Sequence, residues 1–542
     1  MSQQRRSGAP EAKAARASAG FAYPLFRVGA KARQLLFAPP DPWPRDTALG
    51  RRMVASGESL AWGVAAETGE MGAHRFGWLG DLRAAGGDAA RARGQSLVKD
   101  WVRRHGLKAW RPLWTPPLLA DRIVNWIVHF DFFGRPAPQS WKGPFFASLA
   151  LQARALARAV PGLSSTAERV RALHALVAFG AAVPGAQARL DRALALLRPV
   201  LEKWPPNGVI AERNPSHQLA ALRGLIGIRS VLAAAHHEPP LPLEAAIARA
   251  GRALAALRHG DGGLALFHGG LEEDPRIVGA ALTLSGAAAV EPHAFSGGFE
   301  RAAAGETLLL LDAAAPPPRG HDGCAHAGML AFELGAGAQR LVVNCGAYNG
   351  RDEGWRAAGR MTAAHSTLTV GDRNSAELQP GGGIRRGPAD MTLDRQEDQG
   401  AVWIAASHDG YLGRFGILHR RRLFFAADGA DLRGEDRIAP AAGRRIPKKT
   451  LGTPFTIRFH LHPALAVGET ERDPDGTTAV PFASAESGPW HLIAGSRLAA
   501  AVEESFYLGR GGSPLRARQI VLSGTIDDDT GIEARWAIKR MS

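Results

Sequence analysis

GCAHAGMLAFELGAGAQRLVVNCGAYN, which runs from Gly323 to Asn349, and AAHSTLTVGD, at Ala363 to Asp372, contain three short apolar runs that are typical of strands. Polar side chains stand at the ends of these runs. His326 precedes the first run, Asn344 ends the second and His365 enters the third. The two stretches therefore predict neighbouring strands whose ends bring polar groups together.

The chain after Leu282 continues in the same style, with short and often alternating apolar runs bounded by Gly, Asp or Pro. The clearest further runs are AVWIAAS, RRLFFAA, FTIRFHLH, WHLIAG, AVEESFYL and RQIVLSG. Many short antiparallel strands in succession predict a sandwich of two sheets. We therefore expect a β-sandwich domain over residues 296–542.

The preceding part of the chain has apolar residues at helical spacing, from about Ser96 to Leu257. Seven amphipathic segments follow one another, most of them separated by short turns. Such helices close into an α/α toroid or stack as a solenoid, and the lack of a fixed-length repeat favours the toroid. We expect an α/α toroid domain over residues 46–295, preceded by a basic, Pro- and Ala-rich arm over residues 1–45. A cleft is expected between the two folded domains.

The 542-residue chain is basic, with a net charge of +15. A basic surface favours anionic partners such as acidic polysaccharide, although the Arg- and Ala-rich composition is also expected from a GC-rich genome. No nucleotide-binding or nucleic-acid-binding motif is present, so no specific nucleic acid is expected. The two cysteines, Cys324 and Cys345, cannot form a disulfide framework.

The sequence contains no segment that is long enough to span a bilayer. The first residues, MSQQRRSGAP, lack the apolar run of a secretory signal. Taken alone, these features predict a cytoplasmic protein without a transmembrane segment. The oligomeric state is left open.

ERNPSHQLAAL, at Glu212 to Leu222, is a candidate helix start. Asn214 before Pro215 fits an N-cap residue followed by Pro at the first helical position. An N-cap side chain usually bonds to its own helix. The neighbouring Arg213 and His217 would still face the cleft, where a bidentate arginine and the positive helix end favour a carboxylate.

HAGMLAFEL (His326–Leu334), LVVNCGAY (Leu341–Tyr348) and AHSTLTV (Ala364–Val370) resemble the C-terminal sandwich of the heparinase II/III-like polysaccharide lyases. HDGYLGRFGILHRRRLFF, GEDRI and RFHLHPAL are also similar to this bacterial family, and the resemblance extends over roughly residues 95–530. It implies an α/α toroid followed by a β-sandwich. It also implies a lyase that cleaves a glycosaminoglycan or another uronate polysaccharide by β-elimination.

The resemblance further implies a structural zinc ion, for which the matching ligand positions are His326, Asn344 and His365. Two imidazoles suit zinc, but Asn344 stands where the family has Asp, and an amide oxygen is a poorer ligand than a carboxylate. The alternative is a hydrogen-bonded polar cluster of the same three side chains. No other cofactor is expected.

β-Elimination requires a group that neutralises the uronate carboxylate, a base that removes the neighbouring C5 proton and an acid that protonates the leaving oxygen. The resemblance directs these roles to five candidate catalytic residues, Asn214, His217, His268, His321 and Tyr348. Candidate substrate-binding residues are Arg213, Arg360, His408 and Tyr411. The tyrosine that relatives place in the later helical part has no counterpart, because the four tyrosines of this chain are Tyr23, Tyr348, Tyr411 and Tyr507.

Two functions therefore remain as expectations. The first is a polysaccharide lyase that acts on a uronate-containing acidic glycan. The second is a non-catalytic acidic-glycan-binding or envelope-associated scaffold protein that retains the lyase fold. The missing tyrosine and Asn344 favour the second function. The family resemblance implies the periplasm or cell envelope, in contrast to the cytoplasm indicated by the first residues.

Overall fold

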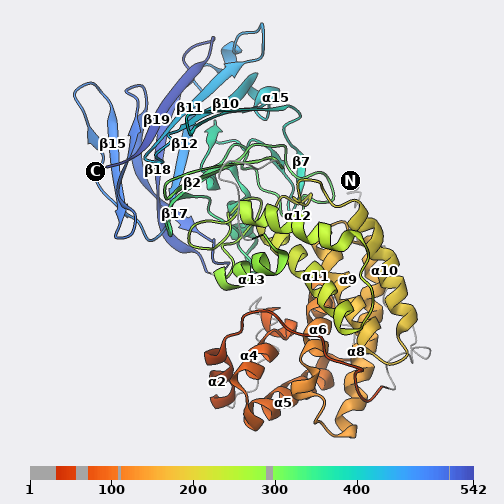
Figure 1. The fold of residues 1–542 in the computed structure, drawn as a ribbon. Helices are drawn as coiled ribbons and strands as arrows, with labels where there is room; N and C mark the ends of the chain where they lie inside the picture. The colour runs from red at the N-terminus through yellow and green to blue at the C-terminus, as the bar shows by residue number, and fades with distance from the viewer. Residues whose placement is uncertain (1–31, 57–70, 108–110, 288–296, 512, 542) are drawn as a thin grey trace, which may run out of the picture.

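The chain forms a helical domain followed by a β-domain that covers one end of it (Figure 1). The computed structural model describes residues 32–56, 71–107, 111–287, 297–511 and 513–541. Most of the predicted N-terminal arm lies outside these ranges. The predicted boundary at residues 295 and 296 also falls outside them.

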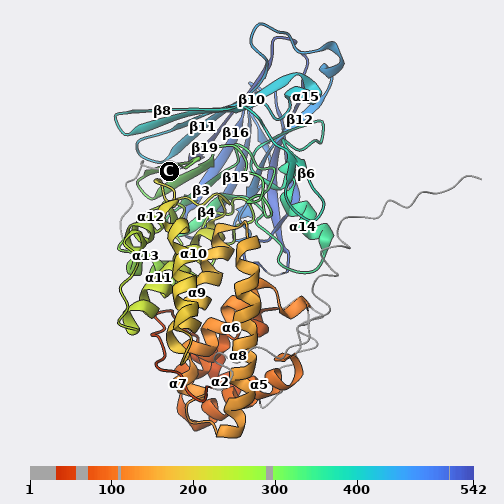
Figure 2. The same ribbon diagram turned by 90° about the vertical axis from the view of Figure 1, so that its right-hand side faces the viewer.

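All seven predicted amphipathic segments are helical over most of their length. Helix α9 packs against α6, α8, α10 and α11, while α11 also packs against α12 and α13. The long helices of this group stand side by side (Figure 2). The bounds of the helices in this domain are α2 (Thr47–Ala55), α4 (Trp78–Ala85), α5 (Gly87–His105), α6 (Pro116–Val128), α7 (Phe130–Phe133), α8 (Gln139–Ala159), α9 (Thr166–Ala182), α10 (Gln187–Glu202), α11 (Pro215–Ala234), α12 (Pro242–Ala256) and α13 (Pro275–Ser285).

The β-domain consists of two large antiparallel sheets. The eight-stranded sheet has the order β1-β2-β3-β4-β12-β18-β17, and β5 also pairs with β12. Its strands are β1 (Phe299–Ala304), β2 (Thr307–Asp312), β3 (Phe332–Ala336), β4 (Gln339–Val343), β5 (Leu368–Val370), β12 (Pro454–Leu461), β17 (Ala499–Tyr507) and β18 (Leu515–Thr525).

The nine-stranded sheet has the order β13-β15-β16-β19-β11-β10-β9-β8, and β14 also pairs with β15. Its strands are β8 (Met391–Asp398), β9 (Ala401–His408), β10 (Ile417–Phe425), β11 (Asp431–Pro440), β13 (Ala466–Val467), β14 (Glu471–Arg472), β15 (Thr478–Ser484), β16 (Gly488–Ala494) and β19 (Ile532–Arg540). The small hairpin of β6 (Glu377–Leu378) and β7 (Ile384–Arg386) and the short helices α14 (Glu353–Arg360) and α15 (Leu412–Phe415) lie in the connections.

The two large sheets share one apolar core, because alternate residues of their strands point inward. Phe332 of β3 stacks on Trp536 of β19 with ring centroids 5.6 Å apart, which joins the two sheets at the centre. The sandwich predicted from the alternating runs is therefore present. None of the described helices is long and apolar enough to cross a bilayer.

A buried polar group lies inside this apolar core. Asp436 of β11 accepts hydrogen bonds from His419 (2.7 Å), Arg421 (2.8 and 2.9 Å) and Trp536 (2.9 Å). Arg421 in turn donates to the carbonyl oxygens of Leu330 and Ser366. Because Leu330 and Ser366 belong to the two stretches that carry His326 and His365, Arg421 fixes those stretches against the second sheet.

Replacing Asp436 with Asn should destabilise the protein by about 3–5 kcal/mol, because it leaves the charge of buried Arg421 uncompensated. Urea denaturation followed by tryptophan fluorescence measures this loss. Glu435→Gln is the matched control, since this neighbouring carboxylate lies on the outer face of the same strand and should change stability by less than about 1 kcal/mol. Equal stability of the two variants would contradict the assignment.

Candidate ligand-binding site

A buried ionic cluster joins the start of α11 to the sandwich. Asp312, the last residue of β2, forms an ion pair with Arg213 and another with His268, whose Nε2 lies 3.0 Å from Oδ2. Arg213 also donates to the carbonyl oxygens of Gly298 (2.6 Å) and Ala315 (2.7 Å). Burial acts to raise the pKa of Asp312, but the charges of Arg213 and His268 hold it below its usual value.

The backbone shows that this cluster is tightly held. Arg213 has a φ of 48° and His268 a φ of 47°, in the left-handed region that residues other than glycine seldom adopt. Such conformations persist only where the surrounding contacts impose them. Arg213 is 8% exposed and His268 is 2% exposed, and both are already paired with Asp312, so neither side chain is free to bind a ligand.

Asn214 acts as the N-cap of α11, as its position before Pro215 predicts. Its Oδ1 accepts from the backbone N–H of His217 (3.0 Å), and its Nδ2 donates to the carbonyl oxygen of His268 (2.8 Å). The side chain is 2% exposed. The structure therefore brings Arg213, Asn214 and His268 together, but engages them in the domain interface.

Two of the three predicted zinc ligands, His326 and His365, bond to each other. His326 Nδ1 lies 3.1 Å from His365 Nε2, and His365 Nδ1 bonds to the carbonyl oxygen of Met361 (2.8 Å). Burial lowers the pKa of His326 well below its usual value and that of His365 to about 4, so both imidazoles are neutral near pH 7.

Asn344 does not complete a metal site with the two histidines. Its Nδ2 donates to Glu333 (3.0 Å), and its Oδ1 accepts from the backbone N–H of Ser366 (3.1 Å). In the part of the chain that the structure describes, no group of three His, Cys, Asp or Glu side chains is placed to hold a metal ion. These residues therefore do not fit the zinc site that the resemblance implies.

The remaining histidine candidates lie at another place in the interface. His217, in the first turn of α11, and His321, in the loop between β2 and β3, both lie close to Glu212. The Nδ1 atom of His321 is 3.7 Å from Glu212 Oε2. The structure therefore places these two histidines beside the same carboxylate.

Two predicted substrate-binding residues belong to the interior of the sandwich. His408 is 1% exposed and bonds to His419 (3.2 Å), and Tyr411, also 1% exposed, donates from its hydroxyl to the carbonyl oxygen of Leu368 (2.9 Å). Burial raises the pKa of Tyr411 above its usual value. Alternation along β9 places His408 on the inner face, and Tyr411, at the start of α15, also lines the pocket described below while its hydroxyl is bonded inside the sandwich. Their binding roles stay a prediction.

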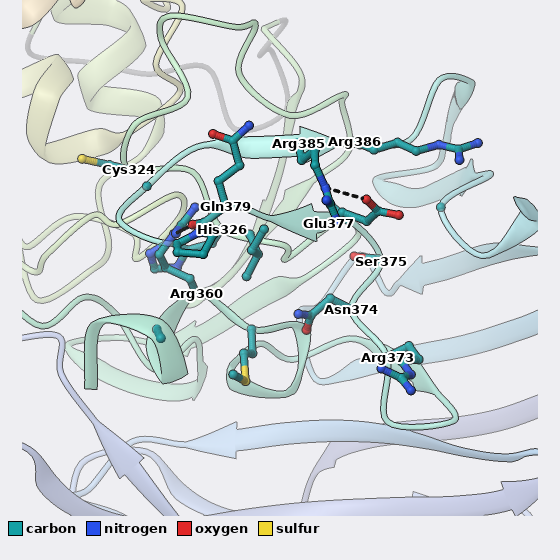
Figure 3. A pocket seen from close by; sticks show the side chains of 18 of the residues that line it. Cys324, His326, Arg360, Arg373, Asn374, Ser375, Glu377, Gln379, Arg385 and Arg386 are labelled. Atoms are coloured by element: carbon teal, nitrogen blue, oxygen red, sulfur yellow. Dashed lines mark hydrogen bonds and ion pairs between the residues drawn. The ribbon is translucent and has the colours of Figure 1, made fainter. Parts of the chain in front are cut away.

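A large pocket lies on the sandwich side of the domain interface, next to His326 (Figure 3). Its volume is about 1320 Å³. Tyr348, predicted as catalytic, and Arg360, predicted as substrate-binding, both line it. The lining includes six arginines but only three carboxylates, namely Arg356, Arg360, Arg373, Arg385, Arg386 and Arg414 with Glu353, Glu377 and Asp409. We call this cavity the arginine pocket.

The six arginines differ in how they are engaged. Arg360 donates to the carbonyl oxygens of Ala325, Gln379 and Gly383 and so braces the pocket wall, and Arg385 forms an ion pair with Glu377 (3.0 Å). Within the described residues no ion pair is formed by the exposed Arg356, Arg373, Arg386 and Arg414. Figure 3 shows Arg360 close to His326, whereas Arg373 and Arg386 lie on the opposite side of the pocket.

Sequence reasoning missed the residue that connects these polar groups to the helical domain. Glu333 of β3 is fully buried and accepts from His259 Nε2 (2.8 Å), from the backbone N–H of Leu266 (2.9 Å) and from Asn344. The only available clue was a carboxylate within the apolar run MLAFEL. Its partner His259 lies 74 residues away in the sequence, which no local pattern indicates.

Known proteins resemble this chain in sequence and in fold. Residues 291–537 match the family model "Heparinase II/III-like, C-terminal". A curated relative, FtsZ-localized protein C of Caulobacter vibrioides, is 29% identical over 537 residues, covering 93% of this chain and 89% of the relative.

Solved structures show the same fold at low sequence identity. Heparinase III has a TM-score of 0.68 and 14% identity, covering 86% of this chain and 76% of its own. The heparan sulfate lyase HepC from Pedobacter heparinus has a TM-score of 0.56 and 16% identity, again covering 86% and 76%. The predicted fold class, an α/α toroid followed by a β-sandwich, is thereby confirmed.

Treatment with EDTA should leave the melting temperature of the protein unchanged within about 1 °C, because His326 and His365 bond to each other and Asn344 bonds to Glu333 and Ser366 without a metal ion. Differential scanning fluorimetry with and without the chelator measures this. His365→Ala should lower the melting temperature, since it removes the partner of buried His326. A fall with EDTA that added zinc reverses would contradict the prediction.

Proposed function

We propose that the protein binds an anionic glycan in the arginine pocket, because residues 291–537 match the heparinase II/III-like family model. In this proposal the helical-domain residues at the family's catalytic positions do not perform β-elimination. The protein would thus be an acidic-glycan-binding protein that retains the lyase fold.

One observation carries the proposal. Arg213, Asn214 and His268 are each less than 10% exposed and bond to other parts of the protein. In a lyase the side chains with these roles must contact the substrate, because its carboxylate must be neutralised and two protons must move. Freeing Arg213 would leave buried Asp312 with His268 as its remaining ionic partner, which is unfavourable.

The arginine pocket supplies the groups that an anionic ligand requires. Arg373, Arg386 and Arg414 are exposed at its rim, and a guanidinium binds a carboxylate or sulfate through two parallel hydrogen bonds. At about 1320 Å³ the pocket is larger than most cavities that hold a single small molecule. Its size and charge therefore support a segment of an acidic polymer, with uronate-containing polysaccharide as the first class to test.

A polysaccharide lyase is the second candidate, and a specific observation favours it. Tyr348 and His326 line the same pocket as the arginines, so a phenol and a neutral imidazole would meet a bound glycan there. A phenol and an imidazole are groups that move protons in β-elimination. In this alternative the chemistry would use the sandwich residues and not Asn214 or His268.

Two measurements distinguish glycan binding from glycan cleavage. Isothermal titration with heparan, chondroitin, hyaluronan, alginate and bacterial exopolysaccharide should detect binding of at least one polymer, without a rise in ultraviolet absorbance from unsaturated uronate. Arg373→Ala, Arg386→Ala and Arg414→Ala should each weaken binding about tenfold by removing charged hydrogen bonds. Arg518→Ala, an exposed arginine of β18 away from the pocket, is the matched control.

The outcomes of this experiment are distinct. Failure to bind any acidic polymer, or equal binding by all four variants, would overturn the proposed ligand site. A rise in absorbance that Tyr348→Phe abolishes would establish the lyase instead. A rise that depends on Asn214 or His268 would show that the buried cluster opens during turnover.

The relative's name adds a proposed partner, FtsZ. That name describes where the relative localises, and the two chains align over nearly their full lengths. We extend that localisation to this chain. The extension rests on the alignment and not on any contact in the structure.

A fluorescent fusion of the full chain should localise with FtsZ in cells of the organism that encodes it. The triple variant Arg373→Ala, Arg386→Ala, Arg414→Ala shows whether the arginine pocket is needed for this, and Arg518→Ala is again the control. Uniform fluorescence of the unaltered fusion would contradict the proposed localisation, and would leave glycan binding to be judged by the titrations.

A further inference from the structure

Glu212, His217 and His321 form a second polar site, on the helical side of the domain interface. Glu212 and His217 flank Arg213 and Asn214 in ERNPSH, while His321 comes from the β2–β3 loop of the sandwich. None of the three lines the arginine pocket. We call this group the acceptor site, because its free atoms are suited to accept hydrogen bonds.

Glu212 is anchored by one carboxylate oxygen only. Its Oε1 accepts from the hydroxyl of Ser165 (2.7 Å) and from the backbone N–H of Ala167 (3.1 Å), at the N-terminus of α9. Its Oε2 is buried and has no hydrogen-bond partner among the described residues. The side chain of Glu212 is only 3% exposed, so this oxygen is a carboxylate acceptor held in place and left unused.

Two imidazole nitrogens are also buried and unpaired. The Nδ1 atoms of His217 and His321 are buried without a hydrogen-bond partner in the described part of the chain. His321 Nδ1 lies 3.7 Å from Glu212 Oε2, beyond hydrogen-bond distance, and the charge of Glu212 acts directly on His217. Buried polar atoms are nearly always paired, so three unpaired atoms at one place indicate a missing hydrogen-bond donor.

The charge around the site favours a cation. Glu168, in the first turn of α9, adds a second carboxylate that interacts with Glu212. Arg171, whose charge acts on His217, is ion-paired with the half-buried Asp121. Burial lowers the pKa of His217, which leaves its ring neutral and able to accept a hydrogen bond near pH 7.

We propose that the acceptor site binds an ammonium group of the ligand. An ammonium group supplies three N–H donors and a positive charge, which match two imidazole nitrogens and one carboxylate oxygen. The inference rests on the proposed function and extends it. The ligand would be an aminoglycan that carries carboxylates for the arginine pocket and unsubstituted amino groups for the acceptor site.

Cys324 connects the two sites. It lines the arginine pocket, and its thiol is acted on both by Arg360 of the pocket and by Glu168 and Glu212 of the helical domain. Cys324 is therefore under the influence of charges from both sites. Opposite charges at the two sites would select a ligand that carries both signs.

The test uses one polymer in two forms, alternating glucuronate and N-acetylglucosamine, before and after N-deacetylation. Isothermal titration of the full chain should show about tenfold tighter binding of the deacetylated form, because a charged hydrogen bond is gained. Glu212→Gln should abolish this preference without changing affinity for the acetylated form. Its amide oxygen still accepts at α9, while its NH₂ group faces the ammonium.

Controls keep the result interpretable. Glu306→Gln removes an exposed carboxylate of the β1–β2 turn and should retain the preference. His321→Ala leaves the Ser165 and Ala167 bonds to Glu212 in place, so it should reduce the preference even if Glu212→Gln fails to fold. Thermal melts establish folding of each variant.

Equal binding of both forms by the unaltered protein would overturn the inference and leave the proposed function standing. It would show that Glu212 and His321 form an internal ion pair only. A preference that survives both Glu212→Gln and His321→Ala would also overturn it. Failure of both forms to bind would instead count against the proposed function itself.

Discussion

The ion pair between Arg213 and Asp312 is the constraint on which the arrangement of the two domains depends. Asp312 ends a strand of the sandwich, and Arg213 immediately precedes the N-cap of α11. Both are buried, so neither charge is tolerable without the other. The left-handed φ of Arg213 follows from this, since the chain must turn sharply to point Arg213 at the sandwich while Asn214 begins the helix.

That turn also determines the directions in which the neighbouring side chains point. Glu212 points back to the N-terminus of α9, and Asn214 bonds to its own helix and to the carbonyl oxygen of His268. Similar ties recur along the interface, where Arg340 pairs with Asp261 and Glu333 with His259. The polar groups that a lyase would direct at a substrate thus hold the domains together. Four exposed arginines that form no ion pair within the described residues line the arginine pocket instead.

Much of the fold was predictable because its causes are local. The spacing of apolar residues predicted seven helical segments, and their alternation predicted the strands from MLAFEL to RQIVLSG. The N-cap role of Asn214 was predictable as well, since it involves only the next three residues. The alternation of buried and exposed residues along β9 also predicts that His408 faces inward. The family resemblance instead suggested that His408 binds substrate.

The sequence by itself determined the two domains, their secondary structure and the strand-end position of His326 and His365. Only the tertiary structure decided which polar residues bond to each other and which remain open to a ligand. Arg213 and Asp312 are 99 positions apart, and Glu212 reaches α9 across 45 positions. Periodicity and capping act within one element, whereas the burial and pairing of a charge depend on elements that meet only when the chain has folded.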